Sequence, residues 1–209
     1  KVLYEQGHQA AMGFDVALKA FEVDPSSEDM LAIVEEIGNA AERFDDLVRV
    51  YKVCADRESD QTRRISLLMK AAVVCREKIE DSDSAVERTL DVLAIAPFDE
   101  DVVKQVWDMI RTLEADLLAT KKGVYWGKVI EVYRQLIDAS KRDVEKQVEL
   151  TLVISKVYAE ELKDNVRAFE ALKEAQGLAP TDESTIDKLE QMAGVLDMWD
   201  DLAEHYRDI

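Results

Sequence analysis

Histidines that could act in acid–base or metal chemistry are few in this sequence. Only His8 and His205 occur. Glu5 and His8 have the Glu-x-x-His spacing that supplies half of a di-iron carboxylate site on a helix. Such a site needs a second Glu-x-x-His, but the residue three before His205 is Leu202. We therefore expect no metal site.

The cysteines also lack a catalytic arrangement. Cys54 and Cys75 lie in apolar, helix-like patterns and not in a Cys-x-x-Cys pair, which is typical of buried thiols in a reducing compartment. A disulfide between neighbouring helices would need Cα atoms within about 7 Å, closer than helices usually pack. The 7 glycines are scattered singly, so no phosphate-binding loop or nucleophile elbow occurs. We expect a cytoplasmic protein that is not an enzyme and carries no cofactor.

The composition excludes further classes of protein. The 209 residues include 27 Lys and Arg and 45 Asp and Glu, which gives a formal charge of −18 that would repel nucleic acid. A hydrophobic content of 47% is too high for a disordered acidic tail, and no apolar run is long enough for a membrane helix. Because Ile209 lies inside an apolar helical pattern and Lys1 is not methionine, we expect a fragment of a longer protein.

The prolines indicate that the chain repeats itself. Each of the 3 prolines ends an apolar helical pattern and precedes a polar cluster that can begin a new helix. The prolines are Pro25, Pro97 and Pro180, and the clusters are residues 26–29, 99–101 and 181–183. The prolines are separated by 72 and 83 residues, so a period of this length is predicted.

A gap-free alignment supports this period. Residues 60–97 align with residues 143–180, so that Cys75 falls on Tyr158. A second element begins with Phe44, Trp126 or Trp199, and an aromatic residue at this place is expected to fill the space between adjacent hairpins.

One insertion of 10 residues, near 113–122, explains most of the difference between the two spacings. It is interpreted either as a helix about two turns longer that packs locally, or as a protruding contact element. Trp107 stands where the other copies have Glu35 and Glu190, and either fills space in this longer hairpin or contacts a ligand.

Apolar residues recur at intervals of three and four, which predicts helices and no strands. Each period holds four amphipathic segments, hence two hairpins, and a partial hairpin precedes Pro25. A single hairpin cannot bury its own apolar face, so stacked hairpins are expected. The predicted helices span 27–39, 42–57, 60–79, 83–95, 99–119, 124–139, 143–162, 164–177, 182–195 and 198–209.

The pattern resembles the tetratricopeptide repeat family. That motif places alanine four residues before an aromatic residue on the second helix, with proline eight residues later. Here the counterparts are Ala85-x3-Thr89 with Pro97, Ala168-x3-Leu172 with Pro180 and, more weakly, Gly13-x3-Ala17 with Pro25. The resemblance implies an all-α superhelix, a solenoid of stacked antiparallel helical hairpins. The expected single array covers 1–209, with hairpins at 1–24, 26–57, 60–96, 98–140, 143–179 and 181–209.

The resemblance further implies a non-catalytic protein–protein interaction module. The first helix of each hairpin would line a concave face that binds a partner protein or peptide. The implied lining is mostly acidic, which has two competing explanations: it favours a basic segment as the ligand, or the charge serves only the solubility of the array. The implied lining residues are Asp29, Glu36, Ser66, Asp101, Lys104, Asp108, Arg111, Glu149, Lys156, Asp187 and Gln191.

Two other functions remain open at this point. The chain could be a structural spacer or self-assembly array whose repeat ends join other repeats or a second copy. It could also be the regulatory domain of a larger enzyme. Neither nucleic acid nor membrane insertion is expected.

Overall fold

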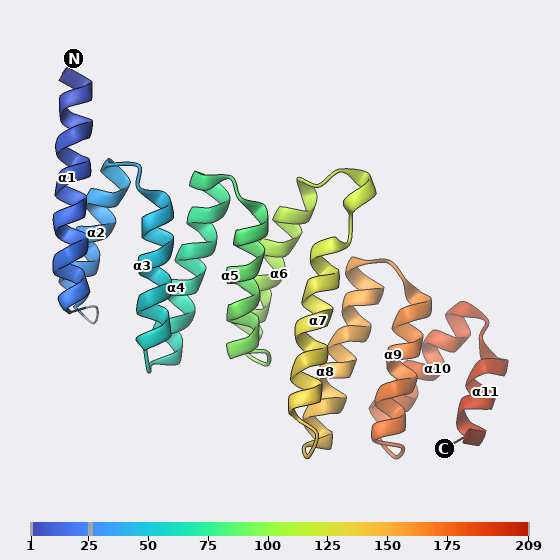
Figure 1. The fold of residues 1–209 in the computed structure, drawn as a ribbon. Helices are drawn as coiled ribbons and strands as arrows, with labels where there is room; N and C mark the ends of the chain where they lie inside the picture. Colours follow the sequence, from blue (N-terminus) through green and yellow to red (C-terminus); the bar gives the residue numbers. More distant parts are fainter. Residues whose placement is uncertain (1, 25–26, 209) are drawn as a thin grey trace. The chain divides into compact units, whose positions relative to one another are not determined.

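The computed structural model describes residues 2–24 and 27–208. Side chains of residues 2–10 and 22 are also outside the description, so the Glu5–His8 pair and Pro25 lie outside the described residues. The described residues contain helices and no strand, so the prediction of an all-α chain is confirmed for them (Figure 1). The α-helices are α1 (Val2–Val23), α2 (Glu28–Ala40), α3 (Phe44–Arg57), α4 (Gln61–Val74), α5 (Ser82–Ile95), α6 (Glu100–Ala115), α7 (Val124–Ala139), α8 (Val144–Lys156), α9 (Asn165–Leu178), α10 (Glu183–Leu196) and α11 (Trp199–Asp208).

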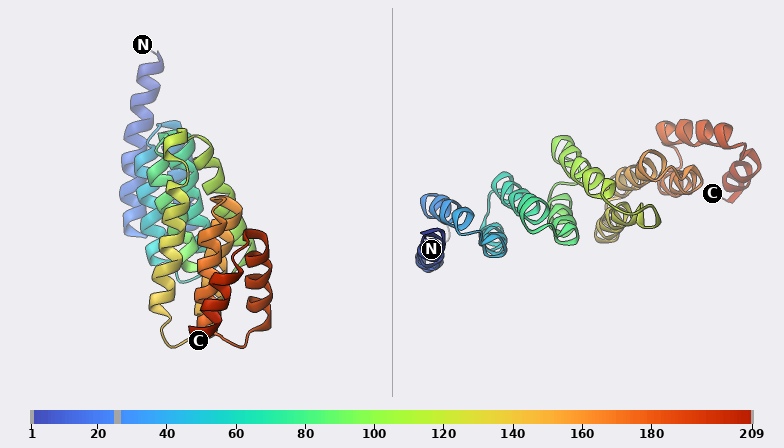
Figure 2. Two further views of the ribbon diagram at one scale, coloured as in Figure 1. Left: turned by 90° about the vertical axis from the view of Figure 1, so that its right-hand side faces the viewer. Right: turned by 90° about the horizontal axis from the view of Figure 1, so that it is seen from above.

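The chain divides into two compact units, and the division along the sequence falls within α6. Unit 1 covers residues 1–113 and unit 2 covers residues 114–209. Within unit 1, each helix from α1 to α5 packs against the next one, and within unit 2 the same holds from α7 to α11. Figure 2 shows these neighbouring pairs from two further directions. None of the helices within the described residues is both long and apolar enough to span a membrane.

The helices that follow the prolines begin as predicted. In each case the residue two positions after the proline is the N-cap, whose side-chain oxygen accepts a hydrogen bond from a backbone N–H three residues later. Ser27 accepts from Met30 at 3.3 Å, Asp99 from Val102 at 3.1 Å and Asp182 from Thr185 at 2.9 Å. Such caps satisfy backbone donors that the first helical turn leaves without partners.

The aligned segments 60–97 and 143–180 also fold alike. Asp60 and Asp143 cap α4 and α8, and Asp81 and Asp164 cap α5 and α9. Both α4 and α8 continue into a π-helical turn, η1 (Cys75–Ile79) and η3 (Val157–Glu161). The backbone of the sequence repeat is therefore also a structural repeat.

Each π-helical turn is followed by a sharp reversal at equivalent residues. Glu80 has φ 60° and Lys163 has φ 55°, which places both in the left-handed region. This conformation is uncommon for residues other than glycine, so its recurrence 83 positions apart marks the same turn.

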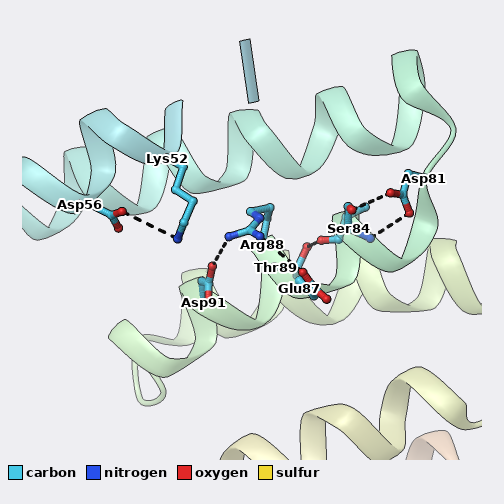
Figure 3. A network of polar contacts seen from close by, with 9 residues as sticks. Lys52, Asp56, Asp81, Ser84, Glu87, Arg88, Thr89 and Asp91 are labelled. Atoms are coloured by element: carbon cyan, nitrogen blue, oxygen red, sulfur yellow. Dashed lines mark hydrogen bonds and ion pairs between the residues drawn. The ribbon is translucent and has the colours of Figure 1, made fainter. Parts of the chain in front are cut away.

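Polar side chains hold the start of α5 in this turn (Figure 3). Asp81 accepts hydrogen bonds from the Ser84 backbone N–H at 3.0 Å and from the Ser84 hydroxyl at 2.6 Å. The buried hydroxyl of Thr89 donates to the Ala85 carbonyl at 2.8 Å. Local hydrogen bonds of this kind satisfy polar groups without involving a ligand.

The predicted apolar faces form the cores of the two units. Ala85 and Val86 in α5, and the equivalent Ala168 and Phe169 in α9, have no solvent exposure. In unit 2, Phe169 packs with Leu172, Leu189, Ala193 and Leu202, which come from α9, α10 and α11. Burial of these side chains is the main force that holds successive helices together.

The prediction that the insertion lengthens the helix at 99–119 is wrong. Helix α6 ends at Ala115, and a loop with one 3-10 turn, η2 (Ala119–Lys121), precedes α7. Gly123 before α7 has φ 85°, a conformation that glycine adopts without steric cost. Leu118 of this loop is 72% exposed.

The aromatic residues at the start of the second helices differ in burial. Trp126 is 4% exposed, as predicted for a residue that fills space between hairpins. Trp199 is 51% exposed, so the same prediction is wrong there. Its ring lies against Gly194 of α10. Trp107 is 5% exposed and lies in α6.

Candidate binding grooves

A groove of unit 1, named groove A, has a volume of about 830 Å³. It is formed mainly by α4, with contributions from α2, α3 and the start of α6. Its lining residues are Glu35, Tyr51, Gln61, Thr62, Ile65, Ser66, Met69, Lys70, Val73, Val74, Asp99, Val102 and Gln105.

Unit 2 has a corresponding groove B of about 600 Å³. It is formed by α8 with its π-helical turn, α9 and α10. Its lining residues are Glu149, Leu152, Val153, Ser155, Lys156, Ala159, Glu160, Asn165, Leu172, Lys188, Gln191, Met192 and Val195.

The two grooves overlap in part when the two copies of the repeat are compared, mainly along α4 and α8. When the sequence is shifted by the repeat distance of 83 residues, five lining positions of groove A fall on lining positions of groove B. The equivalent pairs are Ser66 and Glu149, Met69 and Leu152, Lys70 and Val153, Val73 and Lys156, and Gln105 and Lys188. At these five positions the two grooves share the same places in the repeat but have different side chains.

A polar cluster lies in groove A. The Lys70 ammonium group is 2.7 Å from a Glu35 carboxylate oxygen and 5.8 Å from the centre of the Tyr51 ring. Burial raises the pKa of the Tyr51 hydroxyl, and the neighbouring Glu35 carboxylate, which accepts its hydrogen bond, raises that pKa further. Three residues from three successive helices thus hold one another by charge, hydrogen bond and cation–π contact.

Groove B combines an apolar floor with mixed charge. Leu172 is buried, and Leu152 and Met192 are partly buried against the same core. Two carboxylates, Glu149 and Glu160, and two ammonium groups, Lys156 and Lys188, line the groove. Apolar floors with a few charged side chains are typical of sites that bind part of another molecule.

The structure brings only some of the predicted lining residues to these grooves. Ser66 lies in groove A, and Glu149, Lys156 and Gln191 lie in groove B. Asp108 pairs with Arg111 at 2.8 Å, outside both grooves. The other predicted residues outside both grooves are Asp29, Glu36, Asp101, Lys104 and Asp187, all exposed to solvent.

The apolar lining of the grooves, which includes Met69, Val73, Leu152 and Met192, was not predicted from the sequence. The available signal was their spacing, because Met69 and Val73 lie three and seven residues after Ser66 on one helix face.

In the described part of the chain, His205, Cys54 and Cys75 have side chains that could act as a catalytic base or as nucleophiles, but none of them has an arrangement typical of catalysis. His205 Nε2 lies 2.7 Å from the Gln176 side-chain oxygen. Cys54 and Cys75 form no disulfide and are buried, and burial raises the pKa of both thiols. A thiol with a raised pKa is a weak nucleophile at neutral pH. In the described part of the chain, no three metal-ligating side chains come together as a metal site would need.

Models of known protein families give no match to this chain, and a search of curated proteins finds no significant relative. The chemistry of grooves A and B must therefore be read from their own residues.

Proposed function

We propose that this chain is a non-catalytic protein-binding module built from tetratricopeptide-like hairpins. Helices α2, α4, α6, α8 and α10 would be the first helices of these hairpins. Grooves A and B would each hold a segment of a partner protein. The observation that carries the proposal is that each unit has a groove with apolar and charged lining residues, and that five lining positions of the two grooves are equivalent in the repeat.

The proposed ligand is a short segment with apolar anchors and basic flanking residues. The partly buried Leu152 and Met192 of groove B, and Met69 of groove A, provide surface for apolar anchors. The overall charge of −18 favours a basic partner, because complementary charge speeds association. Two cysteines that form no disulfide are consistent with the reducing cytoplasm as the place of action.

Selection from a library of displayed random peptides tests this proposal directly. The affinity of the selected peptides is then measured for the natural chain, for Val153→Glu in groove B and for Val73→Glu in groove A. Either substitution places a carboxylate among apolar lining residues. We therefore expect the affinity to fall by at least about tenfold, on the order of the cost of burying an unpaired charge in an interface.

Val144→Glu is the matched control, because Val144 lies on α8, is 49% exposed and lies outside groove B. Equal loss in Val144→Glu and Val153→Glu, or no selected peptide, would contradict binding in the grooves. Sedimentation of the chain alone distinguishes the remaining function: concentration-dependent assembly without any peptide would favour an array that associates with itself.

A further inference from the structure

Groove B carries charged residues at three positions of the repeat where groove A has uncharged ones. Groove A differs in the other direction at one position, where it has Lys70 and groove B has Val153, but Lys70 forms an ion pair with Glu35 inside groove A. Because the helices of the first copy form without the three charges, the fold of the repeat does not require them. The three pairs, with the residue of groove B first, are Glu149 and Ser66, Lys156 and Val73, and Lys188 and Gln105.

A fourth charged residue of groove B, Glu160, lies in the π-helical turn η3. The equivalent residue of the first copy is Glu77, which pairs with its neighbour Arg76. The residue equivalent to Arg76 is Ala159, so Glu160 lacks this neighbour. Ala159 and Glu160 line groove B, whereas Arg76 and Glu77 do not line groove A. The π-helical turn of the second copy thus adds a carboxylate to groove B.

The four charged residues divide between the two ends of groove B. Helices α8, α9 and α10 run alternately in opposite directions, so α8 and α10 run in the same direction (Figure 1). Glu149 in α8 and Lys188 in α10 each lie six residues after the N-cap of their helix. Lys156 and Glu160 lie seven and eleven residues after Glu149, toward the other end of the groove. Each end therefore has one carboxylate and one ammonium group.

Three of these charged groups are available to a ligand. Within the part of the chain that the structure describes, Glu149, Glu160 and Lys188 form no ion pair and no hydrogen bond through their side chains. All three are exposed, and the floor beside them includes Leu152 and Met192, which pack against one core. A ligand on this floor can pair with the charged groups without displacing an existing partner.

The next helix of the array does not fill groove B. Helix α11 follows α10 and packs against it, but none of the α11 residues lines the groove. Groove A shows the same relationship in unit 1, because it remains open although α5 and α6 follow α4. The occupant of groove B is therefore not the next hairpin of the stack.

The spacing of the charges fits a short extended segment. Glu149 and Lys156 are seven residues apart on α8, which corresponds to a rise of about 10 Å. An extended segment covers this distance with about three residues, so two residues lie between those that contact the two ends. These two middle residues lie over the apolar floor. A ligand with basic residues alone would meet an ammonium group at each end, whereas a basic and an acidic residue together match both charges.

We propose that groove B selects an extended segment of a partner protein in which two apolar residues are flanked on each side by one basic and one acidic residue. At one end of groove B, the basic residue pairs with Glu149 and the acidic residue pairs with Lys188. The two apolar residues lie against Leu152 and Met192. This inference rests on the proposed function, because it specifies the ligand of groove B, and it assigns no charge preference to groove A.

Four synthetic hexapeptides with capped ends and two central leucines are the probes. The mixed peptide is Lys-Glu-Leu-Leu-Glu-Lys, and the other three have only lysines, only glutamates or only glutamines around the leucines. Binding of each peptide to the full chain is measured by isothermal titration calorimetry. We expect the mixed peptide to bind at least about tenfold more tightly than each of the others, as expected for a hydrogen bond to a charged group.

Two variants, Lys188→Gln and Glu149→Ser, introduce the residues that groove A has at the equivalent positions. Lys188→Gln should weaken binding of the mixed peptide about tenfold, and should not weaken binding of the lysine peptide, because it removes a like charge. Glu149→Ser should weaken binding of both peptides. Lys141→Gln and Glu145→Gln are the matched controls, since both residues are exposed, lie in unit 2 outside groove B, and their substitution changes the net charge equally. Circular dichroism verifies that each variant keeps its helices.

Three results would overturn this inference and leave the proposed function in place. They are tightest binding of the lysine peptide, equal binding of the mixed and glutamine peptides, and equal effects of Lys188→Gln and Lys141→Gln. Absence of binding by all four peptides would also overturn the inference, whereas a random library that yields no peptide would contradict the proposed function. Dimerisation of the chain alone that Lys188→Gln abolishes would show that a second copy occupies groove B, and would replace the proposed ligand.

Discussion

Glu114 and Lys122 cap the two helix ends that the inserted loop joins. The Glu114 carboxylate accepts hydrogen bonds from the backbone N–H groups of Gly123 at 2.8 Å and Tyr125 at 2.7 Å, at the start of α7. The Lys122 ammonium group donates to the carbonyl of Ala115 at 3.0 Å and to that of Glu114, at the end of α6. The negative group lies at a helix N-terminus and the positive group at a C-terminus, so both interact favourably with the helix dipoles.

Glu114→Ala should therefore destabilise the protein. Glu114 is 6% exposed, so its removal leaves backbone donors at the start of α7 without their acceptor. We expect the free energy of unfolding to fall by about 1–3 kcal/mol, the cost of unsatisfied buried donors. Urea denaturation monitored by circular dichroism measures this, with the exposed neighbour Asp116→Ala as the control. Equal stability of the two variants would contradict the capping role.

Two glycines should respond to alanine in opposite directions. A Cβ atom at Gly38 would lie 2.7 Å from Leu47 Cδ2 and 2.8 Å from Phe14 Cε2, so Gly38→Ala overpacks a buried contact between helices. We expect the free energy of unfolding to fall by about 1–3 kcal/mol.

A Cβ atom at Gly127 in α7 meets nothing within 4 Å. Because alanine has a higher helix propensity than glycine, Gly127→Ala should raise the free energy of unfolding by about 0.5–1 kcal/mol. Thermal unfolding measures both; a stabilised Gly38→Ala would contradict the packing of α2.

Stability below pH 5 should depend on Asp81. The hydrogen bonds from Ser84 hold the pKa of the Asp81 carboxyl below its ordinary value of 3.8. Because the folded state favours the charged form, this contribution is present above about pH 4 and is lost as the pH falls through the lower folded value. Asp81→Asn keeps a capping oxygen but cannot titrate. The variant should therefore lose less stability than the natural protein between pH 5 and pH 3.

Urea melts at pH 7, 5 and 3 test this, and the exposed Asp83→Asn serves as the comparison. An identical pH profile for Asp81→Asn and the natural protein would show that the Asp81 cap does not contribute.

The two thiols should resist modification in the folded protein. Cys54 is 7% exposed and Cys75 is 1% exposed, and burial raises the pKa of each. Ellman's reagent needs an accessible thiolate, so labelling at pH 7 should be slow in buffer and rapid for both thiols in urea. Rapid labelling of both thiols in buffer would show that α3 or α4 is not packed as described.

Helix boundaries and the repeat could be predicted from the sequence because the signals are local. Asp99 and Asp182, each two positions after a proline, act as N-caps of the helices that follow. The spacing of apolar residues by three and four positions likewise predicted helices with one buried face, and Val86 and Phe169 are buried on such faces. These features need no knowledge of distant contacts.

The inserted segment shows where local signals fail. Apolar residues such as Leu117 and Leu118 extend the helical pattern beyond Ala115, yet the helix ends there. The deciding contacts join Glu114 to Gly123 and Tyr125, nine and eleven residues later, and no helical periodicity encodes them. Hydrogen bonds of this range become available only when α6 and α7 are in place.

A helical, acidic and repeated chain can be predicted from the amino-acid sequence alone, since helix propensity, caps and charge are properties of short segments. Which side chains line a groove and which aromatic residues are exposed depends on how the helices pack. Trp126 and Trp199 hold the same place in the repeat, but one is 4% and the other 51% exposed. The physical reason is that burial depends on the next helix to pack against the residue, and that neighbour is not part of the local pattern.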